Sequence, residues 1–564
     1  MNSNLLGSFL RTPDIAIFLK HVGLSTYESL EVICVSGIAI SATMAFFAPR
    51  GKLRVFTFIL LYLLYLQCLR IGQTFMSFQW DIMLIEFGVI CSIMVLAPHQ
   101  GLALGRWLLV RLMFHSGYKK LESGCPTWWR LTALNYHFES QCIPTPLAYY
   151  AHHLPDLALK AGVAVTFIAQ IGLIPLALSP NRRLRVLIGW THIFHQLGIA
   201  ATGNYNFFNW LTIILCIACF DDEHINWLTG TKSSVKKIKS SVATSAFCRL
   251  MELAQVVILY LLISQAVWID TESGDVRLLE VAEDQSKLRW TRDHFVKPAI
   301  LLSTLWLAYC AFKDLAKSFW SFIAIPLSFL VLSCSFIPFT DMDRQTQMLV
   351  APFSQNLYYS TRNFGLVNSY GLFRRMTGVG GRPEVVVELA GSDGTFKELD
   401  FLYKPTDLKT ELPWVAPHQP RLDWQMWFAA LGKIDHNTWL VNFAIRILQQ
   451  KEEVLNLIDR NSYEKKFGLY KPIYVRMYTY KYHYTKNRED GVWYRDSKQM
   501  YLNAITLEDP NVKSYLERSS LNLAPDKSNL PQLFSTFRSL SQAYNAETII
   551  VTFMLMLLTK RFVL

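Results

Sequence analysis

Two pairs of cysteines have the residue type and spacing that most directly suggest chemistry. Cys216 and Cys219 have the spacing of a redox pair, but both lie in an apolar run, where the reactive thiolate is disfavoured. Packing therefore explains this pair better than redox chemistry. Cys125 and Cys142 share a polar, aromatic loop, so the sequence predicts a disulfide between them, with two free thiols as the alternative.

Two carboxylates lie inside an apolar run. Asp81 and Glu86 fall within residues 81–97, and a carboxylate at that depth is expected to face the interior of a helix bundle or a cavity. Glu86 together with a histidine could transfer a proton. It could equally be held in place by Arg or Trp donors, and the sequence does not separate these two roles.

Histidines are concentrated near the same apolar runs. His192 and His195 are three residues apart and can share one helix face, with His152 or Asp156 as a third ligand. A metal site needs three or four converging ligands, so hydrogen-bonded histidines are the better explanation. No metal and no cofactor is predicted.

The composition places these residues in a membrane protein. Of the 564 residues 52% are hydrophobic and 17% are charged, whereas about a quarter are charged in soluble domains. Lys and Arg occur in short clusters between apolar runs, which is typical of membrane-protein loops and not of a nucleic-acid-binding domain. The sequence thus predicts a polytopic α-helical bundle of about eight to ten helices. The candidate spans are 30–48, 55–69, 81–97, 101–113, 157–178, 186–201, 207–220, 251–269, 298–311, 318–336 and 548–558.

Charge in the loops predicts which regions share a compartment. The segment 232–239 contains four lysines, which places it in the cytosol by the positive-inside rule. Counting crossings from that segment puts the loop 118–156 and the polar region 341–546 together on the opposite side. The predicted domains are transmembrane helices over 1–117, a non-cytosolic loop over 118–156, transmembrane helices over 157–340, a non-cytosolic β-rich domain over 341–546, and an apolar helix with a tail over 547–564.

The polar region 341–546 is predicted to form an α+β domain. Residues 384–389 and 395–404 alternate in polarity around a Gly-Ser-Asp-Gly turn, which is typical of a β-hairpin. Alternating tyrosines and an Asp-Gly turn predict a second hairpin over 474–494. A helix over 438–458 lies between the hairpins, and a β-sandwich with packed helices is the expected frame.

The helix after the first hairpin carries a candidate binding surface. Trp424 and Trp427 recur at helical spacing after Arg421, and Trp and Arg are enriched in the cores of protein interfaces. For Trp427, burial in the domain core is favoured over an interface role. For Arg421 and Trp424, the two roles are equally well supported. Arg374 and Arg375 precede a glycine-rich turn without the ending of a phosphate loop, so they are candidates for an acidic partner or a lipid head group, with a solvated face as the alternative.

Five segments resemble a known family. They are FQWDIMLIEFG from Phe78, the stretch from Trp107 to Pro155, GNYNFFNWLTIILC from Gly203, YGLFRRMTGVGGRPEVVVE from Tyr370, and VAPHQPRLDWQMWFAALG from Val415. These motifs are similar to those of the lipase maturation factor family. The membrane half also resembles, more distantly, the transmembrane domain of vitamin K-dependent carboxylase.

The resemblance implies a multi-pass endoplasmic-reticulum membrane protein with a luminal C-terminal domain. Members of such a family help dimeric secreted lipases to fold, assemble and leave in active form, without a catalytic constellation. The implied partners are secreted lipases or other secretory client proteins, membrane lipid, and endoplasmic-reticulum chaperones or oxidoreductases.

Two other functions remain open at this point. The first is a membrane enzyme of carboxylase-like architecture that uses Glu86, His192 or His195 as acid or base on a lipid-like or protein substrate. The second is thiol exchange with a partner through Cys125 and Cys142.

Overall fold

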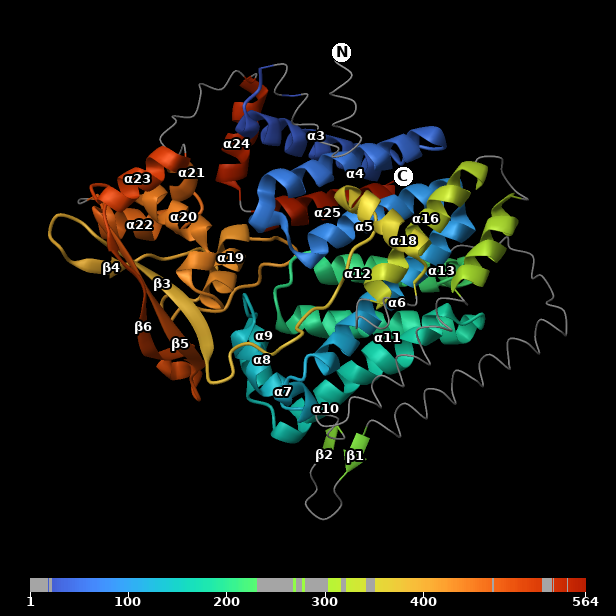
Figure 1. Cartoon of the computed structure of the whole chain (residues 1–564), viewed down its shortest axis with the longest axis horizontal. Helices are drawn as coiled ribbons and strands as arrows, with labels where there is room; N and C mark the ends of the chain where they lie inside the picture. Colours follow the sequence, from blue (N-terminus) through green and yellow to red (C-terminus); the bar gives the residue numbers. More distant parts are fainter. Residues whose placement is uncertain are drawn as a thin grey trace.

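The computed structural model of the chain describes residues 19, 23–230, 267–269, 276–278, 303–315, 321–340, 350–468, 471–519, 530, 532–544 and 546–563. These residues form a helical N-terminal part and a C-terminal part in which helices pack on a sheet (Figure 1). The predicted class, a polytopic helical bundle followed by an α+β domain, is confirmed.

The N-terminal part is a bundle of long helices. Among the described residues, five helical stretches are long and apolar enough to cross a membrane, so the chain is a membrane protein. They are α3 (Thr26–Phe47), α4 with η1 (Lys52–Gly72 and Gln73–Met76), α5 (Gln79–Leu96), α10 with η2 and η3 (Asp156–Phe167, Ile168–Leu173 and Ile174–Leu178), and α16 (Ser321–Thr340). Each overlaps a span that the sequence predicted.

The helix α6 (Pro98–Glu122) runs through the interior of the bundle. The sequence suggested a short span or an interfacial helix over 101–113, because two arginines interrupt the apolar run. The structure instead forms a 25-residue helix whose arginines are both buried. Arg106 donates to the Ala218 carbonyl oxygen at 2.6 Å, and Arg111 donates to Glu86. Neighbouring elements thus supply the polar partners that lipid could not supply.

The remaining spans are described in part. Helices α11 (Arg182–Thr202) and α12 (Phe208–Cys216) coincide with predicted spans, and residues 303–315 are helical. Most of the span expected over 251–269, like the lysine-rich segment 232–239, lies outside the described residues. Its last three residues form strand β1 (Val267–Ile269), which pairs antiparallel with β2 (Val276–Leu278), so that end of the prediction is wrong. The sequence Val-Trp-Ile favours a strand there.

Short helices make the loop 118–156 compact. They are α7 (Pro126–Trp129), α8 (Leu134–Ser140) and α9 (Pro146–His152). Proline begins α7 and α9, where its missing N–H leaves no bond unmade. The loop lies against the sheet, because the ring of Tyr149 in α9 packs edge-on against Tyr484 with 5.2 Å between centroids.

The C-terminal part contains one antiparallel sheet of four strands among the described residues. Its order is β4-β3-β5-β6, from β4 (Phe396–Glu398), β3 (Arg382–Ala390), β5 (Tyr474–Tyr484) and β6 (Trp493–Ile505). Both predicted hairpins are present, since β3 pairs with β4 and β5 pairs with β6. Helices cover the face that a second sheet would cover in a β-sandwich. Val387 and Met477 of the sheet share a core with Met426 and Leu440 of these helices.

The helices of this part complete the frame. They are α19 (Arg421–Ala430), α20 (Thr438–Leu448), α21 (Glu452–Leu455), α22 (Arg460–Phe467) and α23 (Pro510–Ser519). The helix α18 (Pro352–Thr361) packs instead against α16 of the bundle (Figure 1). The single helix predicted over 438–458 is interrupted because Gln450 has a left-handed φ of 56°. The last helices, α24 (Gln532–Ala543) and α25 (Ala546–Val563), return to the bundle, where Arg538 pairs with Glu31 of α3 (Figure 1).

Candidate functional site at the junction of bundle and sheet

An ion pair between Asp81 of α5 and Arg421 of α19 joins the two parts of the chain. Arg421 donates from Nη2 to Asp81 Oδ1 at 2.8 Å and from Nη1 to Oδ2 at 3.0 Å. Tyr65 also donates to Asp81 at 2.6 Å, and Arg421 donates to the Phe75 carbonyl oxygen at 2.6 Å. Asp81 is fully buried, so removing its partner would leave an uncompensated charge. Arg421 is therefore engaged within the chain and is not free on a surface.

Trp424 and Trp427 also face the junction. Trp424 is 4% exposed, and its ring packs edge-on against Trp80 of α5 with 4.8 Å between centroids. Trp427 is 6% exposed and donates from Nε1 to the Ser140 carbonyl oxygen at 2.9 Å. The open client-binding surface of Arg421, Trp424 and Trp427 that the sequence suggested does not form, because burying two indoles against the bundle is more favourable than exposing them.

Glu86 holds the segment that leads from the bundle to the sheet. It accepts a hydrogen bond from buried Arg111 of α6. Its other oxygen accepts from the Tyr370 hydroxyl at 2.7 Å and from the Asn368 amide at 2.9 Å. Three donors therefore hold this carboxylate in place, and its hydrogen-bond partners do not include a histidine. The arrangement is that of a structural anchor.

The histidines of α11 do not converge on a ligand set. His192 is fully buried, and its Nδ1 lies 3.0 Å from the Ile188 carbonyl oxygen one turn earlier. His195, on the same helix, is partly buried. In the part of the chain that the structure describes, no group of three or more His, Cys, Asp or Glu side chains could hold a metal ion. His152 lies instead beside Glu139, with 3.8 Å between Nε2 and Oε2.

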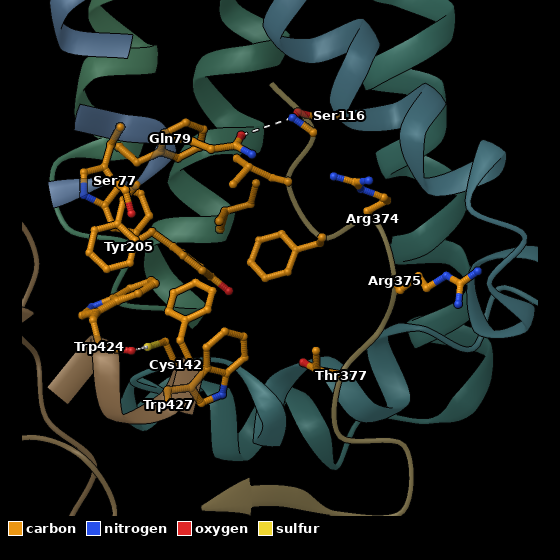
Figure 2. A pocket seen from close by; sticks show the side chains of 18 of the residues that line it. Ser77, Gln79, Ser116, Cys142, Tyr205, Arg374, Arg375, Thr377, Trp424 and Trp427 are labelled. Atoms are coloured by element: carbon orange, nitrogen blue, oxygen red, sulfur yellow. Dashed lines mark hydrogen bonds between the residues drawn. The ribbon is translucent and has the colours of Figure 1, made fainter. Parts of the chain in front are cut away.

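Cys125 and Cys142 do not form the predicted disulfide. Both are free, buried thiols. Cys125 contacts the Thr127 hydroxyl at 3.2 Å and accepts from the Met376 amide at 3.5 Å. Cys142 donates to the Trp424 carbonyl oxygen at 3.7 Å (Figure 2). Burial raises the pKa of Cys142 well above its usual value, so its thiol is a poor nucleophile for exchange. The two thiols bond to different segments of the C-terminal part, which explains why they remain apart.

Arg374 and Arg375 lie on the segment between the bundle and β3. Both are exposed. Arg375 donates from Nη2 to the Ser123 carbonyl oxygen at 3.1 Å, and the Arg374 carbonyl oxygen accepts from the Ser123 hydroxyl at 2.7 Å. The segment is thus fixed to the end of α6 while the Arg374 guanidinium stays accessible.

Sequence reasoning missed a buried charge network that docks the loop onto the sheet. Arg382 and Glu384 of β3 and Lys404 are all buried. Arg382 donates from Nε to Glu384 at 2.7 Å, and Lys404 Nζ lies 3.1 Å from Glu384 Oε2. Arg382 also donates to the carbonyl oxygens of Gln141 and Cys142, the latter at 2.7 Å. Alternation along β3 predicted a strand but not what covers either of its faces. No local signal shows that a segment 240 residues earlier covers it.

Glu139 lies at the same contact, between two histidines. Its oxygens are 3.8 Å from His152 Nε2 and 3.9 Å from His483 Nδ1. Burial raises the pKa of Glu139 to about 7, against the lowering effect of a hydrogen bond from the Tyr484 amide and of the Arg382 charge. Burial and, to a smaller extent, the neighbouring His153 and His483 together lower the pKa of His152 to about 4. The uncharged forms of both groups are therefore favoured in the folded chain.

These shifts give a pH dependence that a single variant isolates. The folded chain binds the Glu139 proton more tightly than the unfolded chain, so this carboxyl lowers stability as the pH rises from 4.5 to about 7. His152 acts in the opposite sense over a similar window. Glu139→Gln removes only the first effect, so the variant should gain roughly 3 kcal/mol relative to wild type across that interval. The gain is measured from the unfolding midpoints of the variant and the wild type in detergent, at about pH 5 and at about pH 7.5. The same difference in stability between the two proteins at both pH values would contradict the prediction.

A cavity of about 570 Å³ lies at the junction (Figure 2). Its walls come from the start of α5, the last turns of α6 and α11, the start of α12, residues 371–377, and α19. In Figure 2, Tyr205, Trp424 and Trp427 form one side, while Arg374 and Arg375 lie on the segment opposite. The cavity thus brings the predicted aromatic and cationic candidates to one place.

The chain matches models of two domains of one family. Residues 1–227 match the lipase maturation factor transmembrane domain, and residues 366–503 match the lipase maturation factor C-terminal domain. Both parts of the structure therefore have counterparts in the same proteins.

Curated relatives extend over most of the chain. It is 37% identical over 557 residues to lipase maturation factor 2 of Xenopus laevis, covering 91% of this chain and 77% of the relative. Identity to lipase maturation factor 2 of Homo sapiens is 34% over 579 residues, covering 94% of this chain and 80% of the relative. Identity to lipase maturation factor 1 of Bos taurus is 24% over 492 residues, covering 83% of this chain and 73% of the relative. No solved structure matches the chain.

Proposed function

The chain belongs to the lipase maturation factor family, and from this we propose that it acts in the endoplasmic-reticulum membrane to help secreted lipases fold, assemble as dimers and leave in active form. The observation that carries the proposal is that similarity to relatives named maturation factors runs through both the bundle and the C-terminal part. In the proposed orientation the loop 118–156 and the sheet face the lumen. Endoplasmic-reticulum chaperones or oxidoreductases are proposed as further partners.

The proposed action is shielding and not catalysis. An incompletely assembled lipase exposes apolar surface at its future interface, and such surface leads to aggregation unless a partner covers it. Glu86, the strongest acid–base candidate, is occupied by donors from Arg111, Tyr370 and Asn368. A binding role therefore fits the described residues better than proton transfer does.

The exposed face of the sheet is the proposed client surface. The outer sheet face consists of the partly or largely exposed side chains of Arg476, Tyr478, Lys498 and Met500, and it lies opposite the helices that cover Val475 and Met477. Lys498 Nζ lies 3.9 Å from the ring centroid of Tyr478, and Met500, which is opposite Tyr478, is 52% exposed. Tyr, Arg and Met are enriched in protein interfaces, so this face suits an apolar partner with polar margins.

The neighbouring edge of the sheet offers a second kind of contact. Strand β6 ends the strand order, and among the described residues it pairs only with β5. Its outer row of N–H and C=O groups is therefore open to an extended segment of a client by strand addition. Charged residues such as Asp496 and Lys498 on β6 limit pairing between copies of the chain.

Removing the two large side chains from the outer sheet face should reduce lipase maturation. The double variant Tyr478→Ser with Met500→Ser is expected to lower the secreted activity of a co-expressed dimeric lipase by about thirtyfold, because each truncated interface side chain costs roughly 1 kcal/mol. Leu457→Ser is the matched control, since Leu457 is 49% exposed but lies beyond α21, away from the sheet. Unchanged secretion at equal membrane levels of the double variant would place the client elsewhere.

The same cells provide a test of the orientation. Protease added to sealed microsomes should leave the C-terminal part intact, because that part is proposed to lie in the lumen. Digestion from the outside would contradict the folding role itself, whereas the variant result addresses only the surface.

A further inference from the structure

The cavity at the junction lies where helices of the bundle end. Ser116 and Lys120 belong to the last turns of α6, and Gln196 belongs to the last turns of α11. Phe428 and Leu431 also line the cavity and are 39% and 40% exposed, so they form its rim. The cavity therefore lies where the helices of the bundle meet the C-terminal part, and its rim is open.

The lining has two chemically different sides. The aromatic side consists of Phe78, Trp80, Phe208, Trp424, Trp427 and Phe428. The cationic side consists of Lys120, Arg374 and Arg375. In Figure 2 the Arg374 guanidinium turns toward the aromatic side chains, whereas that of Arg375 turns away. No Asp or Glu is among the described residues that line the cavity, so its charge is positive.

The cationic side lacks a counterion. Lys120 is buried, and its Nζ donates to three neutral oxygens, those of Ser116 at 2.8 Å, Gln170 at 3.1 Å and Leu372 at 3.2 Å. Among the described residues no carboxylate forms an ion pair with Lys120 or Arg374. Burying a cation without an opposite charge is costly, and an anion that enters the cavity would remove that cost.

We propose that this cavity binds an acyl lipid with an anionic head group. The acyl chain lies along the aromatic side, and the head group accepts hydrogen bonds from Arg374 in the field of Lys120. A volume of about 570 Å³ is within the range of small-ligand pockets. An uncharged lipid would leave Lys120 without a counterion, and a compact anion would leave the aromatic side unfilled. This site goes beyond the client role and does not depend on it.

Photolabelling of the full-length protein in detergent tests the site. The probe is a photoreactive analogue of palmitic acid, and its methyl ester is the uncharged control. Labelling should fall in peptides that contain Phe208 or Trp427, and the acid should bind more tightly than the ester. Phosphatidic acid is added as a competitor. If phosphatidic acid displaces the probe, a phospholipid is the better ligand. If it does not, the ligand is a free fatty acid. Either outcome supports the proposal.

Two arginines that are adjacent in the chain provide the matched variants. Arg374→Gln should weaken binding of the acid by about tenfold, because a hydrogen bond to a charged group is lost. Arg375→Gln removes the same charge from a side chain that turns away and donates to the Ser123 carbonyl oxygen, so it should weaken binding clearly less than Arg374→Gln does. Ile199→Trp fills the cavity and should abolish labelling in folded protein. Equal binding of acid and ester, equal effects of the two arginine variants, or full labelling of Ile199→Trp would overturn the proposal.

Discussion

Glu86→Leu is expected to destabilise the full-length protein by about 4 kcal/mol, and adding Arg111→Leu should recover most of that loss. The single variant strands Arg111, whose side chain is 1% exposed, without a carboxylate. It also removes the acceptor for the Tyr370 hydroxyl and the Asn368 amide. The double variant replaces the buried pair by apolar groups, which is often close to neutral because neither charge then needs desolvation.

The measurement is the unfolding of wild type, both single variants and the double variant in the same detergent. Arg111→Leu alone should also be strongly destabilising, since Glu86 is then buried without its cation. If the double variant loses as much free energy of unfolding as the two single variants together, Glu86 and Arg111 act independently. That outcome would contradict the anchor described for Glu86.

Much of the bundle could be predicted because a membrane span is a local property of the sequence. Runs such as those of α5 and α16 are long and apolar enough to be recognised without any knowledge of their neighbours. The length of the helix α6 was underestimated because it, too, was judged from the local sequence alone. Arg106 and Arg111 suggest an interface when read locally, and only the fold shows that Ala218 and Glu86 receive their hydrogen bonds.

The hairpins were predictable, but the junction was not. Alternation and turn residues define β3 with β4 and β5 with β6 within short stretches of chain. The contacts that build the junction connect residues far apart, such as Glu86 with Tyr370 across 284 positions and Asp81 with Arg421 across 340. One sequence therefore shows which residue types are unusual, but not which of them meet.

The aromatic helix illustrates this limit. Trp424 and Trp427 have the composition of an interface, and the structure places them at an interface within the chain. The loop 118–156 supplies the other side of that contact through Ser140 and Cys142. The residue types indicated a client-binding surface or burial in the domain core, whereas the segments against which these side chains pack depend on the fold.

The docking of that loop depends on a buried carboxylate, and its removal is the second large effect expected. Glu384→Gln should lower the free energy of unfolding by about 4 kcal/mol, because it strands two buried cations, Arg382 and Lys404. Glu388→Gln is a matched control on the same strand face. Its partners Arg476 and Lys498 are partly exposed, so that variant should lose less than about 1 kcal/mol.

Intrinsic fluorescence follows the unfolding of the whole chain, and one contributor is Trp493, whose ring lies 5.8 Å from the Arg382 guanidinium carbon. Wild type, Glu384→Gln and Glu388→Gln are to be unfolded in the same detergent at a pH above the pKa of about 7 of Glu139, so that this carboxyl is ionised in all three. Similar losses in the two variants would show that water reaches Glu384 as it reaches Glu388. The covering of β3 by the loop would then be too loose to hold the loop on the sheet, and docking would have to rest on other contacts, such as those of Tyr149 with Tyr484 and of Trp427 with Ser140.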